Sequence, residues 1–230
     1  MKIHGPSVGI GAAIAGIAVL AIFMIAGSSW FGTTDTKTQS NDNEKFQMSL
    51  LSDNTSPILG SKDAPITMVE FGDYQCFYCN QFYHTTEPDI VKNYINTGKV
   101  KLVFKDLTII GQDSINAAHA AHCAQEKGKF WEYHDELYNN WAGENTGWAS
   151  SKNLLAFATQ LNITASDFNT CMTDARYISM IQGSVSDAHT LGLTGTPDFF
   201  IIGPDNSISK IVGAQPYEAF DEIFKSKLKT

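Results

Sequence analysis

The sequence predicts an α/β domain with an inserted all-helical region, preceded by an N-terminal transmembrane helix. Three observations support this prediction. An apolar run at 66–71 is followed at once by Cys76-x-x-Cys79 and then by a helix-like pattern. From about 113 to 191 the periodicity is helical throughout, and strand-like runs return only after that block. Near the N-terminus, residues 8–26 contain no charged side chain.

The uncharged run at 8–26 has the length of a membrane span. A helix of this length rises about 28 Å, close to the ~30 Å hydrocarbon core of a bilayer. Trp30 and Phe31 follow it and suit an interfacial aromatic anchor. The alternative is a cleaved signal peptide, whose apolar core spans only about 7 to 15 residues. We therefore expect residues 1–31 to be an uncleaved, single-pass anchor in contact with membrane lipid.

Residues 32–56 are rich in Thr, Ser, Asn, Asp and Gln, with few apolar residues apart from the run at 46–51, which predicts a flexible tether between the anchor and a folded domain at 57–230. The formal net charge of the chain is -8. Nucleic-acid binding needs basic surfaces that replace counterions, so a nucleic-acid partner is not expected.

The strand at 66–71 is apolar on both alternating faces except at Thr67 and Glu70, as expected for a central strand covered by helices on both sides. A helix is predicted from Cys76 to about Asn96. Pro88 lies inside it and should kink it, because proline removes a backbone hydrogen bond. A second strand is predicted at 100–104.

The middle block contains only predicted helices. Ser114 is a suitable N-cap for the first, and Gly128 follows its end. The expected helices span 114–126, 129–140, 151–161, a short segment after Thr164, and 175–191.

The C-terminal part of the chain returns to strand periodicity. Strands at 199–202 and 208–212, joined by the turn Gly203-Pro204-Asp205-Asn206, predict a β-hairpin. A last helix is predicted from Pro216, which is a favourable first-turn residue.

The Cys-x-x-Cys pair predicts a redox centre. Two thiols at this spacing can close a disulfide at a helix N-terminus, where unpaired N–H groups and the helix dipole favour a thiolate at Cys76. The alternative is half of a zinc site, but no second Cys-x-x-Cys exists and the nearest metal-like cluster is His119-x-x-His122-Cys123. We expect no metal and no cofactor apart from the redox-active disulfide of Cys76 and Cys79.

Three runs together resemble the DsbA-like thiol:disulfide oxidoreductases, and the likeness covers about Pro57 to Leu228. The runs are FGDYQCFYC at 71–79, GKFWEYHDELY at 128–138 and GTPDFFI at 195–201. The resemblance implies a thioredoxin fold interrupted by a helical domain. The dipeptide Phe77-Tyr78 departs from the Pro-His of the best-known member, in which His⁺ lowers the thiol pKa. We therefore expect a reduction potential between those of thioredoxin and that oxidant, roughly -270 to -120 mV.

Residue roles follow from the motif and from the resemblance. Cys76 is expected to be the exposed nucleophile and Cys79 the buried resolving thiol. Glu70 matches the buried acid beneath the active site and could relay protons to Cys79, with an edge-strand carboxylate in water as the alternative. Thr196 and Pro197 match a cis-proline loop that pairs with an extended substrate, with an ordinary trans turn as the alternative.

The remaining candidates are less specific. Phe77 and Tyr78 form an apolar rim for unfolded clients or simply pack locally. With Cys76 and Cys79 paired, the last two cysteines, Cys123 and Cys171, are expected to form a structural disulfide, with two free thiols as the alternative. The aromatic side chains of the 128–138 run are assigned to helix packing; they are Trp131, Tyr133, His134 and Tyr138.

The expected function is disulfide formation in exported polypeptides by an extracytoplasmic, membrane-tethered enzyme, since cysteines arranged for disulfides belong in an oxidising compartment. Its partners would be unfolded or reduced exported chains and a DsbB- or VKOR-like membrane redox protein. Two alternatives remain. One is a disulfide reductase or isomerase, and the other is a non-enzymatic module that binds metal or unfolded clients.

Overall fold

The structure is a computed structural model that describes residues 45–229. The expected anchor at 1–31 and the first part of the tether lie outside these residues. Among the described residues, no helix is both long and apolar enough to span a bilayer.

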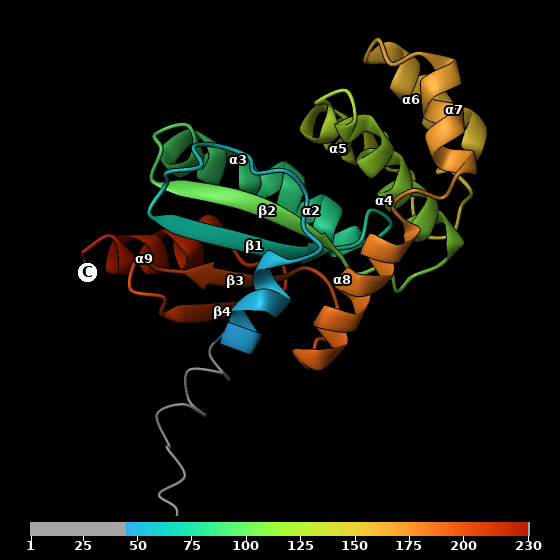
Figure 1. Cartoon of the computed structure of the whole chain (residues 1–230). Coiled ribbons are helices and arrows are strands. Elements are labelled where there is room, and N and C mark those ends of the chain that lie inside the picture. The colour runs from blue at the N-terminus through green and yellow to red at the C-terminus, as the bar shows by residue number, and fades with distance from the viewer. Residues whose placement is uncertain (1–44, 230) are drawn as a thin grey trace, which may run out of the picture. The chain divides into compact units, whose positions relative to one another are not determined.

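A four-stranded mixed sheet in the order β2-β1-β3-β4 forms the centre of the domain (Figure 1). Its strands are β1 (Ile66–Gly72), β2 (Val100–Asp106), β3 (Asp198–Ile202) and β4 (Ile208–Val212). β1 pairs in parallel with β2 and antiparallel with β3, and β3 and β4 form the predicted hairpin. The prediction of a buried central strand at β1 is confirmed, because β1 has a neighbour on each side and is almost wholly buried.

The chain between the two parallel strands is a broken helix. It contains α2 (Phe77–Thr85), α3 (Glu87–Ile90) and the π-helical turn η1 (Val91–Ile95). The break falls at Thr86. Pro88 lies in the first turn of α3, where N–H groups have no intrahelical acceptor, so its missing N–H removes no hydrogen bond from the helix. The predicted kink is therefore confirmed, and α2 ends before the proline.

One face of the sheet is covered by α2, α3 and α9 (Tyr217–Lys227). Phe82 of α2 lies with its ring centroid 4.5 Å from Phe199 of β3 and 5.4 Å from Phe220 of α9. All three side chains are fully buried. This aromatic contact fixes α2 against the sheet and so positions its N-terminus.

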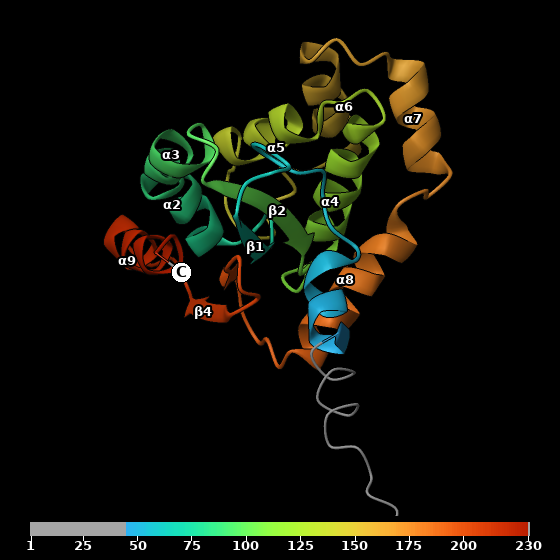
Figure 2. The same cartoon turned by 60° about the vertical axis from the view of Figure 1, so that its left-hand side comes forward.

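The opposite face is covered by α8 (Ile178–Thr190) and by a helix at 45–52, which lie side by side in Figures 1 and 2. Our prediction of a flexible tether to residue 56 is wrong for this helix. Leu51 is 1% exposed and packs in the same cluster as Val69 and Phe71 of β1. Burial of its apolar side chain outweighs the polar composition of the surrounding segment.

The segment after this helix also joins the sheet. The Ser56 amide donates to the Phe104 carbonyl at 2.8 Å, and Leu59 forms an isolated bridge with Leu102 of β2. The folded domain thus includes residues before 57, and the edge of β2 is partly paired.

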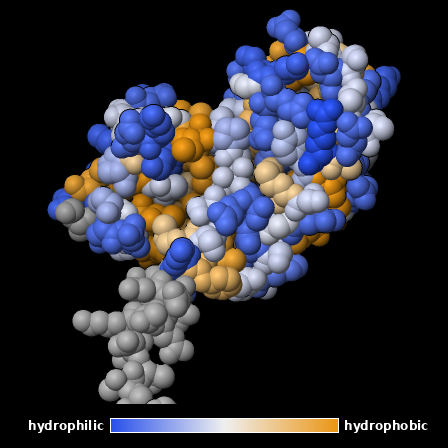
Figure 3. All heavy atoms as spheres, viewed as in Figure 1, coloured by the Kyte–Doolittle hydropathy of each residue, from blue (hydrophilic) through white to orange (hydrophobic). Residues whose placement is uncertain are grey.

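The helical insertion follows β2. It contains α4 (Gln112–Gln125), α5 (Phe130–Asn139), α6 (Ser151–Gln160), α7 (Ala165–Thr173) and α8. In Figure 2, α4 to α7 group on one side of the sheet, and Figure 3 shows mainly hydrophilic side chains over α6 and α7. Within the insertion expected at 113–191, α8 differs from the others because it returns to the sheet.

The start of α4 differs from the prediction. Ser114 is not its N-cap but a buried residue inside the helix, whose hydroxyl accepts a hydrogen bond from Gln75 Nε2 at 3.0 Å. The predicted cap at Thr164 is present, since its hydroxyl accepts from the Asp167 amide at 3.3 Å.

A buried ion pair joins α8 to the sheet and to the N-terminal segment. Lys105 Nζ of β2 lies 2.9 Å from Asp187 Oδ2 of α8 and also donates to the Asp53 carbonyl. Asn54 Nδ2 donates to the same Asp187 oxygen at 3.0 Å. Burial lowers the pKa of Lys105, and Asp187 opposes that shift.

Candidate redox site

The two cysteines of the motif lie where β1 gives way to α2. Cys76 is the N-cap residue of α2, with φ -66° and ψ 127°, and Cys79 is one turn further along. Both are free thiols in this structure. Cys79 is fully buried as predicted, whereas Cys76, which we expected to be exposed, is only 5% exposed. A neighbouring loop covers Cys76, with the Thr196 carbonyl oxygen 3.4 Å from its sulfur.

The two thiols have opposite pKa shifts. A hydrogen bond from the Cys79 thiol is the largest contribution to lowering the pKa of Cys76 to about 6, against the effect of burial. The Thr196 side chain and the amides of Cys79 and Tyr78 lower it further. Burial and the adjacent Cys76 raise the pKa of Cys79 well above its usual value. At neutral pH the pair therefore consists of a nucleophilic Cys76 thiolate and a protonated Cys79.

The Thr196–Pro197 peptide bond is cis. Both residues line a shallow cavity of about 220 Å³ that continues along Lys210 and Val212 of β4. Val212 is 62% exposed at the rim. An extended peptide could lie along this cavity with its backbone against Thr196 and next to the Cys76 sulfur.

Glu70 lies inside the domain on β1. It is 1% exposed, which excludes the alternative of an edge-strand carboxylate in water. Burial raises its pKa well above the usual value, and repulsion from Glu87 and from Cys76 raises it further. Its Oε2 atom has no hydrogen-bond partner among the described residues. The raised pKa favours the protonated acid, and the side chain interacts electrostatically with both cysteines.

Phe77 and Tyr78 project beside the redox pair, 50% and 59% exposed. Their ring centroids lie 5.4 Å apart, and the Phe77 ring is 5.9 Å from Trp141 of the helical insertion. The structure thus agrees with both sequence interpretations. Phe77 packs against its neighbours, as local packing predicts, and much of each ring still faces solvent, as an apolar rim requires.

Two residues of the turn before Cys76 were missed by the sequence analysis. Asp73 is fully buried, and its carboxylate accepts from the amides of Gln75 (2.8 Å), Ile109 (2.9 Å) and Ile110 (3.1 Å). Its own carbonyl accepts from the Cys76 amide at 2.9 Å. An Asp two residues before the amide that it binds is a typical turn signal, which could have identified it.

Gln75 joins this turn to the helical insertion. Besides donating to Ser114, its Oε1 accepts from the Asn145 amide at 2.6 Å and its carbonyl accepts from Trp141 Nε1 at 2.8 Å. These partners lie 39 to 70 positions away in sequence, so no local pattern marks Gln75 as part of the site.

The aromatic run of α5 packs as expected. Tyr133, His134 and Tyr138 are buried, and His134 Nδ1 lies 3.0 Å from the Tyr74 hydroxyl. Burial lowers the pKa of His134 to about 3, so its ring is neutral and does not supply a charge to the thiolate.

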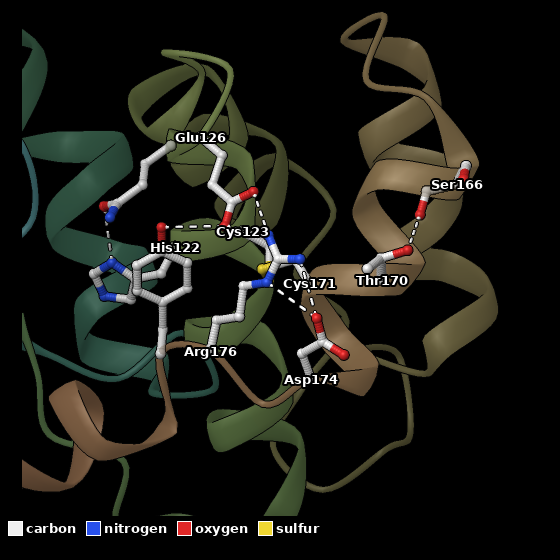
Figure 4. The surroundings of a disulfide bond; sticks show 10 residues. His122, Cys123, Glu126, Ser166, Thr170, Cys171, Asp174 and Arg176 are labelled. Atoms are coloured by element: carbon white, nitrogen blue, oxygen red, sulfur yellow. Dashed lines mark hydrogen bonds and ion pairs between the residues drawn. A yellow bond between two sulfur atoms is a disulfide. The ribbon is translucent and has the colours of Figure 1, made fainter.

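A disulfide joins Cys123 of α4 to Cys171 of α7, 48 positions apart (Figure 4). A ring nitrogen of His119 and both sulfurs lie within 4.8 Å of one another. In the disulfide the sulfurs lack the thiolate charge that binds zinc. His122 points elsewhere, since its Nε2 lies 2.7 Å from Asp106 Oδ2. The three residues of the His119-x-x-His122-Cys123 cluster therefore do not converge on one point. His119 lies beside the disulfide of Cys123, and His122 pairs with Asp106.

A Cys-x-x-Cys pair at a helix N-terminus, next to a cis-proline loop and above a buried acid, defines a thiol:disulfide oxidoreductase of the DsbA type. The relatives of this chain support that class. It is 28% identical over 188 residues to a probable disulfide bond formation protein D of Bacillus cereus, covering 80% of this chain and 84% of that protein.

Two solved structures show the same fold. BdbD from Bacillus subtilis, in its oxidised form, superposes with a TM-score of 0.69 at 25% identity, over 76% of this chain and 93% of that one. Alpha-DsbA1 of Wolbachia pipientis gives 0.67 at 25% identity, over 74% and 89%. The family model described as thioredoxin matches residues 52–225, so this chain belongs to the thioredoxin family.

Proposed function

We propose that this protein is an extracytoplasmic oxidase that introduces disulfides into exported polypeptides through Cys76 and Cys79. The observation that supports it most directly is the asymmetry of the two thiols. The pKa of Cys76 is lowered to about 6, while that of the buried Cys79 is raised. A stabilised thiolate makes the dithiol form favourable and therefore makes the disulfide a stronger oxidant.

The reaction begins with the Cys76–Cys79 disulfide. A client thiolate attacks the Cys76 sulfur and forms a mixed disulfide, and Cys79 leaves as a thiolate that takes up a proton. Glu70 is buried beside the pair and burial raises its pKa, so it is the proposed donor of that proton. A second client thiolate then attacks the client sulfur of the mixed disulfide and releases Cys76 as a thiolate. The client loses two electrons, and the cysteine pair gains them.

The proposed client site is the cavity beside Thr196 and Pro197, with the exposed rings of Phe77 and Tyr78 at its approach. A backbone carbonyl beside the Cys76 sulfur suits an extended polypeptide of any sequence, because main-chain hydrogen bonds do not depend on side chains. The cysteine pair transfers the electrons itself, so the proposal requires no bound cofactor or metal.

Continued turnover requires an oxidant that removes two electrons from the reduced pair. We propose a DsbB- or VKOR-like membrane protein for this step. The apolar run at 8–26 supports the location, since a single-pass anchor would hold the domain close to a membrane partner. The disulfide of Cys123 and Cys171 is consistent with an oxidising compartment outside the cytoplasm.

The test uses the full chain in detergent, oxidised beforehand, with reduced and unfolded ribonuclease as the client. We expect recovery of ribonuclease activity and no recovery with Cys76→Ser. Cys79→Ser, first joined to glutathione through Cys76, should exchange glutathione for a client thiol and be trapped as the mixed disulfide, because it has no Cys79 to resolve it. The reduction potential, measured against glutathione, should lie between roughly -270 and -120 mV. A potential at the thioredoxin end, together with insulin reduction but no ribonuclease recovery, would establish the reductase or isomerase instead. Binding of clients without exchange would establish a client-binding module.

A further inference from the structure

A loop of the helical insertion contacts the redox turn directly. The loop lies between α5 and α6. Trp141 Nε1 donates to the Gln75 carbonyl at 2.8 Å, and the Asn145 amide donates to the Gln75 side chain at 2.6 Å. A third contact reaches the helix that starts after Cys76, since the Phe77 amide donates to Glu144 Oε1 at 3.1 Å. An exposed carboxylate of the insertion therefore lies at the N-terminus of α2.

The first amides of α2 are shared between two acceptors. Those of Tyr78 and Cys79 are directed to the Cys76 sulfur and favour its thiolate. The amide of Phe77, which is the residue next to Cys76, is taken by Glu144. The first turn of a helix has only a few unpaired N–H groups, and its dipole stabilises any negative charge placed there. The carboxylate of Glu144 and the thiolate of Cys76 therefore compete for the same helix terminus.

We propose that Glu144 is a positioning residue that weakens this protein as an oxidant, because its charge opposes the Cys76 thiolate at the N-terminus of α2. The inference rests on the proposed redox function of Cys76 and Cys79. Under this inference, the helical insertion helps to set the reduction potential of the cysteine pair through Glu144.

The other titratable groups near Cys76 cannot play this part. Several are buried groups with raised pKa values or lie in a fixed pair: Cys79 on α2, Glu70 on β1, Tyr138 on α5, and the Asp198 to Lys210 ion pair of the β3–β4 hairpin at 2.9 Å. Asp73 is buried and bound by three amides. Glu144 differs because it is exposed and forms its contact with the helix that stabilises the thiolate.

The test replaces Glu144 by Gln, which keeps an oxygen that can accept from Phe77 but removes the charge. The matched control is Glu222→Gln, which removes one exposed carboxylate from α9. For each full-length protein the Cys76 pKa is measured by thiolate absorbance, and the reduction potential is measured against glutathione. We expect Glu144→Gln to lower the Cys76 pKa by about half a unit, from the usual size of a charge effect at a helix terminus, and to raise the potential. Glu222→Gln should change neither.

Ionic strength gives a readout that a purely structural role would not affect. The pKa difference between wild type and Glu144→Gln should be largest at low salt and should shrink in ~1 M salt, because Glu144 is exposed and its charge is screened. Glu144→Ala, which also removes the acceptor, should add a loss of thermal stability to the same pKa shift.

The outcomes separate the two proposals. If the wild type exchanges disulfides with a lowered Cys76 pKa but Glu144→Gln leaves pKa and potential unchanged, the role of Glu144 is refuted and the redox function stands. If the wild type exchanges no disulfides at all, the proposed function fails first.

Discussion

The sulfur of Cys76 lies 3.4 Å from the carbonyl oxygen of Thr196, although 120 positions separate them in the sequence. The sheet explains the contact. Phe71 of β1 is paired with Asp198 of β3, so the end of β1 and the beginning of β3 meet at the same edge. The turn to Cys76 and the loop with the cis peptide bond both leave the sheet at that point. The site is thus assembled by strand pairing between two distant segments.

The stability of the reduced protein should depend on the Cys76 thiolate. Its folded pKa of about 6 lies below the free-thiol value of about 8.5, so this contribution is present above the latter and is lost as pH falls through about 6. The reduced form should gain about 1.4 kcal/mol relative to the oxidised form between pH 5 and pH 7. Urea unfolding of both forms at the two pH values measures this, with Cys76→Ser as the control. A difference that does not change with pH would refute it.

The contribution of Glu70 to stability should change with pH in the opposite direction to that of Cys76, and Glu70→Gln tests this. The folded pKa of Glu70 is raised, so its contribution is present below the unfolded value and is lost as pH rises through the folded one. The amide cannot ionise, and we therefore expect the variant to gain stability relative to wild type between pH 4 and pH 9. Glu218→Gln, an exposed carboxylate on α9, should show no such trend.

The same Glu70→Gln variant should slow disulfide exchange, because Gln cannot donate the proton to Cys79. Rates with the ribonuclease client across pH 6 to 9 test this. Equal pH profiles for the variant and wild type would leave Glu70 a buried structural residue.

Replacing Cys123 and Cys171 together by Ala should lower the free energy of unfolding by about 4 kcal/mol, the chain-entropy value for a loop of this size. Cys76 should keep its reactivity, because the disulfide joins α4 to α7 and not the redox turn. Chemical denaturation and the rate of Cys76 alkylation measure the two effects. A much slower alkylation of Cys76 would show instead that the reactivity of Cys76 depends on the packing of the helical insertion.

Asp73→Asn should destabilise the turn that presents Cys76. Its carboxylate accepts three backbone amides, and an Asn side chain retains only one of the two oxygens. We expect a loss of about 2 to 3 kcal/mol, because buried amides are left without an acceptor. Thermal unfolding measures it, with the exposed Asp63→Asn as the control. A variant as stable as that control would show that the turn is held by other contacts.

The sequence predicted most of the fold, because strand alternation, helical periodicity and the Gly and Pro positions are local signals. Met68 illustrates this, since its place in an apolar central strand predicted its burial. The burial of Glu70, by contrast, was predicted from the resemblance. Leu51 shows the limit. It ends a short apolar run at 46–51 inside an otherwise polar segment, and the cluster that it packs in is formed by residues far away in the sequence.

The cysteine pair could be predicted from its spacing, but the surroundings of the pair could not. Gln75 and Glu144 contribute through partners 66 to 70 positions away, and such contacts leave no periodic signal in the chain. The burial of Cys76 was missed for the same reason, since it depends on the distant loop at Thr196.

The disulfide between α4 and α7 must form anew in every molecule after synthesis. A chain leaving the ribosome holds Cys123 and Cys171 as thiols, and they must be oxidised before the helical insertion reaches the form seen here. Under the proposed function, every new copy is itself a reduced client when it enters its compartment. Copies that are already oxidised would form the Cys123–Cys171 disulfide in newly made ones, so the protein would catalyse its own folding.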